Sequence, residues 1–422
     1  MPSRRSRACM QPAGTRALCA ECHWRSAESQ TRTSPCRATS STVAACRCGA
    51  TLPSGPTNSR RSGQRQISGG RPGAGVAGLG KCRGMERSRL RGIPNPVESV
   101  AMNSASPMKV AAVQMQGRPG DFAGNLRSAR DYAGQAFADG ARIVALPEFF
   151  ASPVYYDEPF ADQALDADDN PALEMMRDLA RRHRGYIGGS VVLRRGQGVF
   201  NTYFFVQPDG SYRMHDKDLP TMWENCFYEP GQDDGCMDTD LGGVGAAVCW
   251  ELIRTQTVQR LRGRIGLAMT GNHWWTIPSN WPLLTPLLRG LDRVNRGFSE
   301  QAPVEFAKRL GVPVLHASHC GRFRSRFLLL PGTRVSVPHE SEFVGATQIV
   351  DARGQVLARR TTREGPGIVS AEIHLGAQPP VAALDEGRYW IPPLTLLHRA
   401  YWHQQNACGK SFYRQRQQAA GR

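Results

Sequence analysis

The chain has 422 residues, of which 40% are hydrophobic and 21% are charged, so it can bury a sizeable core and is neither wholly disordered nor collagen-like. Its length admits two or three domains, or one large α/β domain. It has no run of about 18 apolar residues, so the sequence predicts no transmembrane helix. The net charge of +17 is uneven, because residues 1–107 hold 17 Lys and Arg against 4 Asp and Glu, whereas the other 315 residues hold 36 against 32.

The N-terminal quarter, residues 1–107, is rich in Arg, Ser, Gly, Pro and Ala and shows neither the period of a strand nor that of a helix. It cannot bury enough apolar surface to offset its chain entropy, so we predict a disordered basic leader. We favour a true start codon farther downstream, at Met102 or Met108, over a genuine extension. The leader lacks the apolar stretch of a secretory signal, and the remaining cysteines do not resemble a secreted disulfide framework, so we expect a cytoplasmic protein.

From Met108 onward, apolar runs alternate with segments of helical spacing. Apolar residues recur every three or four positions over residues 125–138, which predicts a helix. The segments 343–351 and 355–359 flank a Gly-containing turn, which predicts a hairpin. The other predicted elements, in chain order, are strands at 109–115 and 142–146, a helix at 171–183, and strands at 186–193, 201–207, 244–248, 265–270, 313–317 and 367–374. This order indicates a mixed α/β fold whose sheets are covered by helices.

Three places along this part of the chain carry a reactive side chain where a strand ends. Cys249 follows an apolar strand; a buried structural cysteine is the commoner state, and a nucleophilic one needs a nearby base or cation. Glu148 follows another apolar strand and lies between Pro147 and Phe149, where partial desolvation raises a carboxyl pKa toward that of a general base. Lys217, considered alone, is typical of a surface lysine.

Taken together, Glu148, Lys217 and Cys249 with their flanking residues resemble the nitrilase superfamily of carbon–nitrogen hydrolases. The resemblance rests on Val-Ala-Ala-Val-Gln in the first strand, Leu-Pro-Glu-Phe around Glu148 and Cys-Trp-Glu from Cys249, and it covers most of the chain after the leader. It implies a four-layer αββα sandwich and a Glu-Lys-Cys triad. We accordingly expect a carbon–nitrogen hydrolase domain over residues 108–380 and a C-terminal tail over residues 381–422.

The resemblance also implies a role for each residue. Cys249 is the implied nucleophile, Glu148 the base that takes its proton and later activates water, and Lys217 the cation that stabilises the oxyanion. Many members have a second glutamate that orients the reacting groups, and Glu224 matches its position; a solvated loop acid is the alternative. The chemistry needs no cofactor and no metal. Four histidines lack a convincing metal-ligand spacing with acidic partners: His215, His273, His316 and His319.

Motifs around the triad resemble two branches of the superfamily. Lys-x-x-Pro-Thr-x-x-Glu at residues 217–224 and Cys-Trp-Glu at residues 249–251 resemble true nitrilases. Residues 252–254, Leu-Ile-Arg, depart from the nitrilase pattern, and Phe-Tyr-Glu-Pro-Gly at residues 227–231 resembles amidases and carbamoyl-amide hydrolases. We expect hydrolysis of a linear amide or carbamoyl compound through a cysteine thioester with release of ammonia. A nitrile is the alternative substrate.

Four further residues are predicted to line the substrate pocket: Trp250, Arg254, His273 and Trp274. Arg254 could meet a substrate carboxylate in a bidentate pair, or it could be a surface or dimer-interface arginine. Trp274 could form an apolar wall, or it could belong to ordinary core packing.

The expected partners are a small amide or nitrile substrate and a second copy of the chain, as a homodimer or higher homo-oligomer, with no membrane partner. The aromatic tail from Tyr389 could cross a dimer interface or cover its own subunit. Nucleic-acid binding through the basic leader is a remote alternative, because Trp24 is the only aromatic residue there that could stack on bases.

Overall fold

The computed structural model describes residues 106–157, 162–281 and 285–420. The predicted disordered leader lies outside these ranges apart from its last two residues, and so does Met102. Within the described ranges, no helix is long and apolar enough to cross a membrane.

One half of the main sheet is built around β1 (Met108–Met115). Its other strands are β2 (Ile143–Ala145), β3 (Leu165–Asp166), β4 (Tyr186–Arg195), β5 (Gly198–Val206), β6 (Tyr212–Asp216) and β15 (Gly367–Ile373). β1 pairs in parallel with β2 and antiparallel with β15. β2 pairs in parallel with β4, from which β5 and β6 continue as antiparallel strands.

The other half is built around β10 (Val314–His319). Its other strands are β7 (Cys236–Thr239), β8 (Gly242–Val248), β9 (Leu267–Asn272), β13 (Ala346–Val350) and β14 (Val356–Thr361). β10, β9 and β8 are parallel, β7 closes one edge, and the β13–β14 hairpin lies on the other side of β10. The two halves join where Gln114 pairs with Ser318 and Met115 with His319.

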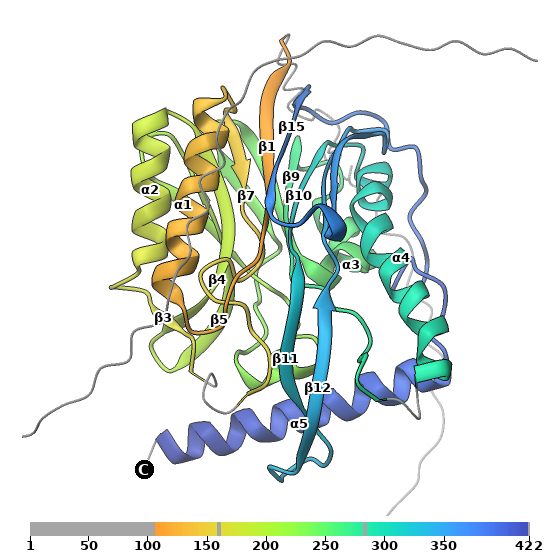
Figure 1. Cartoon of the computed structure of the whole chain (residues 1–422). Helices are drawn as coiled ribbons and strands as arrows, with labels where there is room; N and C mark the ends of the chain where they lie inside the picture. Colours follow the sequence, from red (N-terminus) through yellow and green to blue (C-terminus); the bar gives the residue numbers. More distant parts are fainter. Residues whose placement is uncertain (1–105, 158–161, 282–284, 421–422) are drawn as a thin grey trace, which may run out of the picture. The chain divides into compact units, whose positions relative to one another are not determined.

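Helices cover the outer face of each half, which gives four layers (Figure 1). They are α1 (Phe122–Ala138) and α2 (Pro171–His183) on one side, and α3 (Thr255–Leu261) and α4 (Thr285–Leu310) on the other. Successive residues of β1 face different layers: Ala111 and Val113 pack with the α1–α2 side, whereas Val110 and Ala112 join the core shared with the second half. The predicted α/β class and the αββα sandwich are confirmed.

Capping residues explain the helix boundaries. The helix predicted at residues 171–183 is found at those residues, because Asn170 accepts hydrogen bonds from the first turn and Arg184 ends the helix in the left-handed conformation. The helix predicted from residue 125 begins earlier, at Phe122, because the Asp121 side chain caps it there.

The hairpin prediction needs one correction. The strand predicted at 343–351 is shorter in the structure, where β13 covers only Ala346–Val350. Residue 343, the first of the predicted strand, is instead the last residue of β12 (Ser336–Phe343). β12 pairs instead with β11 (Gly321–Leu328) in a separate two-stranded sheet that the sequence did not predict.

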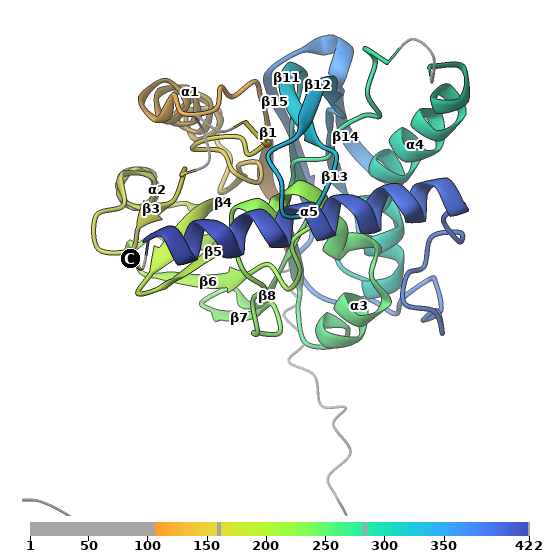
Figure 2. The same ribbon diagram turned by 90° about the horizontal axis from the view of Figure 1, so that it is seen from below.

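The C-terminal tail contains a long helix that the sequence also did not predict, α5 (Leu396–Ala420). It crosses one end of the sandwich, where the β11–β12 hairpin extends (Figures 1 and 2). It packs on η2 (Met222–Cys226), a 3-10 helix of the same chain, and buries Cys408 and Phe412 in one apolar cluster. The tail therefore covers its own subunit, and its contribution to a dimer interface stays a prediction.

Candidate active site

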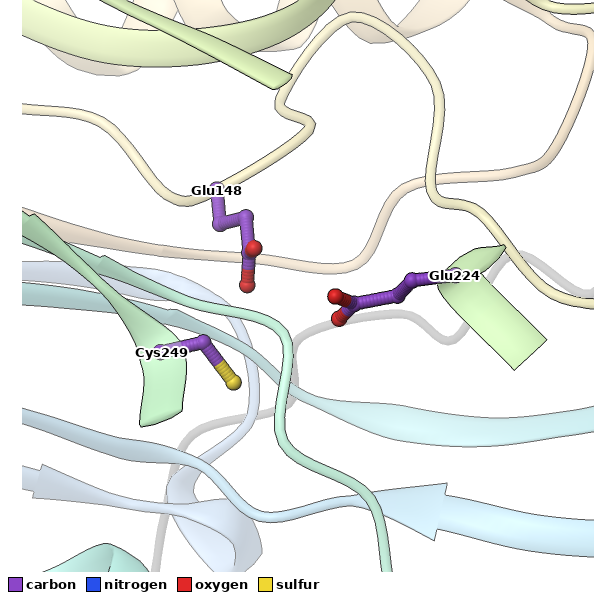
Figure 3. A group of neighbouring side chains, drawn as sticks. All are labelled: Glu148, Glu224 and Cys249. Atoms are coloured by element: carbon purple, nitrogen blue, oxygen red, sulfur yellow. The ribbon is translucent and has the colours of Figure 1, made fainter. Parts of the chain in front are cut away.

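Four of the predicted residues come together at the ends of three strands. Glu148 follows β2, Lys217 follows β6, and Cys249 is the first residue of η3 (Cys249–Ile253), a 3-10 helix after β8; Glu224 lies in η2. Glu148, Lys217 and Glu224 are fully buried, and Cys249 is 2% exposed. Figure 3 shows the side chains of Glu148, Glu224 and Cys249 pointing toward a common centre.

The ammonium group of Lys217 lies between two carboxylates. Its Nζ is 3.0 Å from Glu148 Oε1 and 2.7 Å from Glu224 Oε2. One ligand atom each of Glu148, Glu224 and Cys249 lies within 4.8 Å of the others, a spacing that could also hold a metal ion. In this fold the cation that contacts both carboxylates is supplied by the chain itself, as Lys217.

The backbone of the site loops is strained. Among the described residues, four that are not glycine have a positive φ, and three of them lie in the site loops: Phe149 at 55°, Met222 at 54° and Cys249 at 55°. Such a conformation costs about 1–3 kcal/mol per residue and persists where the surrounding structure over-determines it. At Cys249 it forms the sharp turn from β8 into η3.

Neighbouring polar groups fix the two carboxylates. Asn201 donates to Glu148 Oε1 at 2.8 Å, and the Tyr228 hydroxyl donates to Glu224 Oε2 at 2.5 Å. The other oxygens, Glu148 Oε2 and Glu224 Oε1, are buried and have no hydrogen-bond partner among the described residues. They are therefore free to accept a proton or a hydrogen bond from the reacting groups.

Asn201 and Tyr228 were not predicted as site residues. Tyr228 lies in the motif at residues 227–231 that resembles amidases, and Asn201 is the first residue of the strand predicted at 201–207, although β5 itself begins at Gly198.

Burial and charge set the ionisation of the cluster. Burial raises the pKa of Glu148 to about 7, although Lys217 opposes the shift. Burial and the charge of Glu148 raise the pKa of the Cys249 thiol well above its usual range, with partial opposition from Lys217. Burial alone would lower the pKa of Lys217, but Glu148 and Glu224 raise it well above its usual range. The resting site therefore holds a neutral thiol beside a charged ammonium and a carboxyl that titrates near neutral pH.

A family model described as carbon-nitrogen hydrolase matches residues 109–379. The chain belongs to the carbon–nitrogen hydrolase family. The nitrilase-superfamily resemblance that Glu148, Lys217 and Cys249 carried is thereby confirmed.

The curated relatives of this chain include both amidases and nitrilases. The chloroplastic omega-amidase of Arabidopsis thaliana is 30% identical over 178 residues, which are 38% of this chain and 48% of that protein. The aliphatic nitrilase of Rhodococcus rhodochrous is 26% identical over 295 residues, which are 64% of this chain and 75% of that protein. The chain thus spans about half the length of the omega-amidase.

Among solved structures, a mutant amidase from Nesterenkonia sp. AN1, with the acetamide moiety of fluoroacetamide added covalently at its active-site cysteine, is 18% identical. The match covers 64% of this chain and 92% of that one, with a TM-score of 0.48.

Of the four predicted pocket residues, His273 lies beside the cluster. Its backbone N–H hydrogen-bonds Cys249 and lowers the thiol pKa. Its ring meets Phe149 edge-on at 5.2 Å, and its Nε2 accepts a hydrogen bond from the Val154 N–H at 3.2 Å. Burial and the neighbouring His319 hold the His273 pKa well below its usual range, so the ring is neutral.

The structure also shows the neighbours of the other three predicted pocket residues. Trp250 packs against Trp274 with ring centroids 5.5 Å apart, and both belong to the apolar cluster that also contains Cys249. Arg254 is buried rather than on the surface, and its guanidinium pairs with Asp218.

None of the four cluster residues lines the cavity of about 820 Å³ that the described residues form. Tyr155 and Phe323 form part of its wall and stack at 4.8 Å. Phe323 meets Trp223 edge-on, and Trp223 stacks on Trp275 at 4.0 Å. Packed aromatic rings thus connect the wall of the cavity to η2, which carries Glu224.

Proposed function

We propose that the protein hydrolyses the carbon–nitrogen bond of a linear amide or carbamoyl compound, with Cys249 as the nucleophile. The observation that carries this proposal is the Lys217 ammonium held between Glu148 and Glu224 beside the Cys249 thiol. A thiol, a base and a fixed cation are the groups that acyl transfer through a covalent intermediate requires.

In the first step Glu148 accepts the thiol proton, and the Cys249 sulfur attacks the carbonyl carbon. The Lys217 ammonium stabilises the negative oxygen of the tetrahedral intermediate. Glu148 then gives the proton to the departing nitrogen. The carbon–nitrogen bond breaks, ammonia departs, and the acyl group remains bound to Cys249 as a thioester.

In the second step Glu148 takes a proton from water, and the resulting hydroxide attacks the thioester. The carbon–sulfur bond breaks, the acid product leaves, and the proton returns to the Cys249 sulfur. Glu224 acts through its bonds to Lys217 and Tyr228, which hold the ammonium in position.

The second candidate is a nitrilase. It is favoured by the Lys-x-x-Pro-Thr-x-x-Glu spacing and by the relatives named as nitrilases. The amide is preferred because the motif at residues 227–231 resembles amidases.

The experiment that separates the candidates is ammonia release from a panel of linear amides, carbamoyl compounds and nitriles, with Cys249→Ala as the blank. Release from amides or carbamoyl compounds supports the first candidate. Release from nitriles alone, with an acid product, supports the second, and no release from any class contradicts both.

We also propose that the enzyme is a homodimer or higher oligomer, as the family resemblance implies. Light scattering coupled to size-exclusion chromatography tests this, and a monomer at micromolar concentration contradicts it.

A further inference from the structure

The helix α5 lies beyond the matched family domain, which ends at residue 379, yet it touches the segment that carries Glu224. Figure 2 shows it as one continuous helix across this end of the molecule. The segment it touches is η2, whose Glu224 holds the Lys217 ammonium.

The α5 side chain of Asn406 makes a polar contact to η2. Asn406 Oδ1 accepts a hydrogen bond from the Met222 N–H at 2.9 Å and another from Asn225 Nδ2 at 2.8 Å. Asn225 Nδ2 also donates to the Met222 carbonyl at 2.8 Å. The backbone N–H and the carbonyl of Met222 are thereby both bound in one connected set of hydrogen bonds.

The Met222 N–H needs such a partner. The first N–H groups of a helix have no acceptor within it, and Met222 is the first residue of η2. Met222 also has a φ of 54°, a conformation that a side-chain-bearing residue keeps only when its surroundings hold it. Asn406 supplies an acceptor for this strained peptide from a distant part of the chain.

The helix also approaches η2 closely at Gly409. A Cβ atom at Gly409, one turn after Asn406, would lie 2.8 Å from Asn225 Cβ and 3.1 Å from the Met222 carbonyl oxygen. A larger residue at position 409 would therefore push α5 away from η2.

We propose that Asn406 is a positioning residue for hydrolysis: its side-chain oxygen fixes the start of η2, so that Glu224 holds the Lys217 ammonium against the reacting carbonyl. Glu224 lies two residues after Met222, and its Oε2 accepts from the Thr221 N–H, Tyr228 and Lys217. Releasing the Met222 peptide would move this carboxylate, and with it the ammonium.

Three variants test the proposal. Asn406→Leu removes the acceptor at similar volume, whereas Asn406→Asp keeps it. Gln404→Leu is the matched control, because Gln404 is also half-buried on α5 but donates to the carbonyls of Leu328 and Leu329, at the end of the β11–β12 hairpin, and not to η2.

Asn406→Leu should lower kcat by about tenfold with little change in KM, because misplacement of catalytic groups slows the chemical step. Asn406→Asp and Gln404→Leu should keep most of the activity. An unchanged kcat in Asn406→Leu overturns the proposal. An equal fall in Gln404→Leu also overturns it, because that would assign the effect to docking of the whole helix.

The kinetic measurement rests on the proposed function, so a second measurement is independent of substrate. The rate at which iodoacetamide alkylates Cys249, followed by mass spectrometry, depends on how well Lys217 lowers the thiol pKa. It should fall several-fold in Asn406→Leu but not in Gln404→Leu. An unchanged or faster rate in Asn406→Leu overturns the positioning role even if no panel substrate is turned over.

Discussion

His215 Nε2 lies 3.0 Å from Glu251 Oε2, and both side chains are fully buried. His215 is two residues before Lys217, and Glu251 is two residues after Cys249. This ion pair therefore joins the segment that carries the proposed oxyanion-stabilising cation to the segment that carries the proposed nucleophile.

Glu251→Gln should lower both activity and stability. The Glu251 carboxylate also accepts from the backbone N–H groups of Val248 at 2.7 Å and Asp218 at 2.9 Å, so its loss loosens both segments. We expect a free energy of unfolding lower by about 3 kcal/mol, as for breaking a buried pair, and a kcat lower by about tenfold. Urea denaturation and ammonia-release kinetics measure the two effects. Glu372→Gln, at an exposed glutamate of β15, is the control and should change neither.

His215 should make stability fall at high pH. Burial alone would lower its pKa, but Glu251 and Asp233 raise it to about 10. The stabilisation is therefore complete below the unfolded-state pKa of 6.5 and is lost as pH rises through about 10. Urea denaturation measures the effect: between pH 6.5 and about 10, the free energy of unfolding should fall more in the wild type than in His215→Gln. If the free energies of unfolding of the two proteins changed with pH in parallel, the assignment of a buried, charged His215 would be contradicted.

The ionisation of Glu148 should set the pH dependence of hydrolysis. The proposed base must be charged to accept the thiol proton, and burial raises its pKa to about 7. We therefore expect kcat/KM to rise with pH through about 7. Because the Glu224 charge raises the Glu148 pKa, Glu224→Gln should move the midpoint of its residual activity to lower pH. A wild-type midpoint near the ordinary value of 4.5 would contradict the proposed base.

Lys217→Met should remove most activity and much stability. Loss of the oxyanion partner should lower kcat by about 10²–10³-fold. Loss of the ammonium leaves Glu148 and Glu224 as unpaired buried carboxyls, which should lower the free energy of unfolding by about 3–5 kcal/mol at neutral pH. Adding Glu148→Gln to Lys217→Met should recover part of the stability but none of the activity. A change in KM alone would assign Lys217 to substrate binding.

Cys249→Ala should abolish ammonia release while the protein remains folded. Alanine has the same Cβ as cysteine, so the strained backbone at φ 55° is unchanged and stability should shift by about 1 kcal/mol or less. Cys320→Ala, at another buried cysteine outside the cluster, should retain activity. Turnover by Cys249→Ala, or its loss in Cys320→Ala, would contradict the assignment of the nucleophile.

The sequence by itself was sufficient for the order and kind of most elements, and the family resemblance named the four residues that the structure brings together. Strand alternation, helical spacing and caps such as Asn170 are local properties that neighbouring residues carry. The short motifs around Glu148 and Cys249 resemble a known family, and that resemblance, rather than the position of the motifs at strand ends, implied their chemistry.

Only the tertiary structure decided what those residues contact. Trp250 and Trp274 pack in the core, and Arg254 pairs with Asp218, because the folded chain surrounds them with partners that local spacing does not specify. Asn406 is a further example, because its contact with Met222 spans 184 positions. Contacts at such separation depend on how sheets and helices pack, and a linear pattern of apolar and polar residues does not encode that packing.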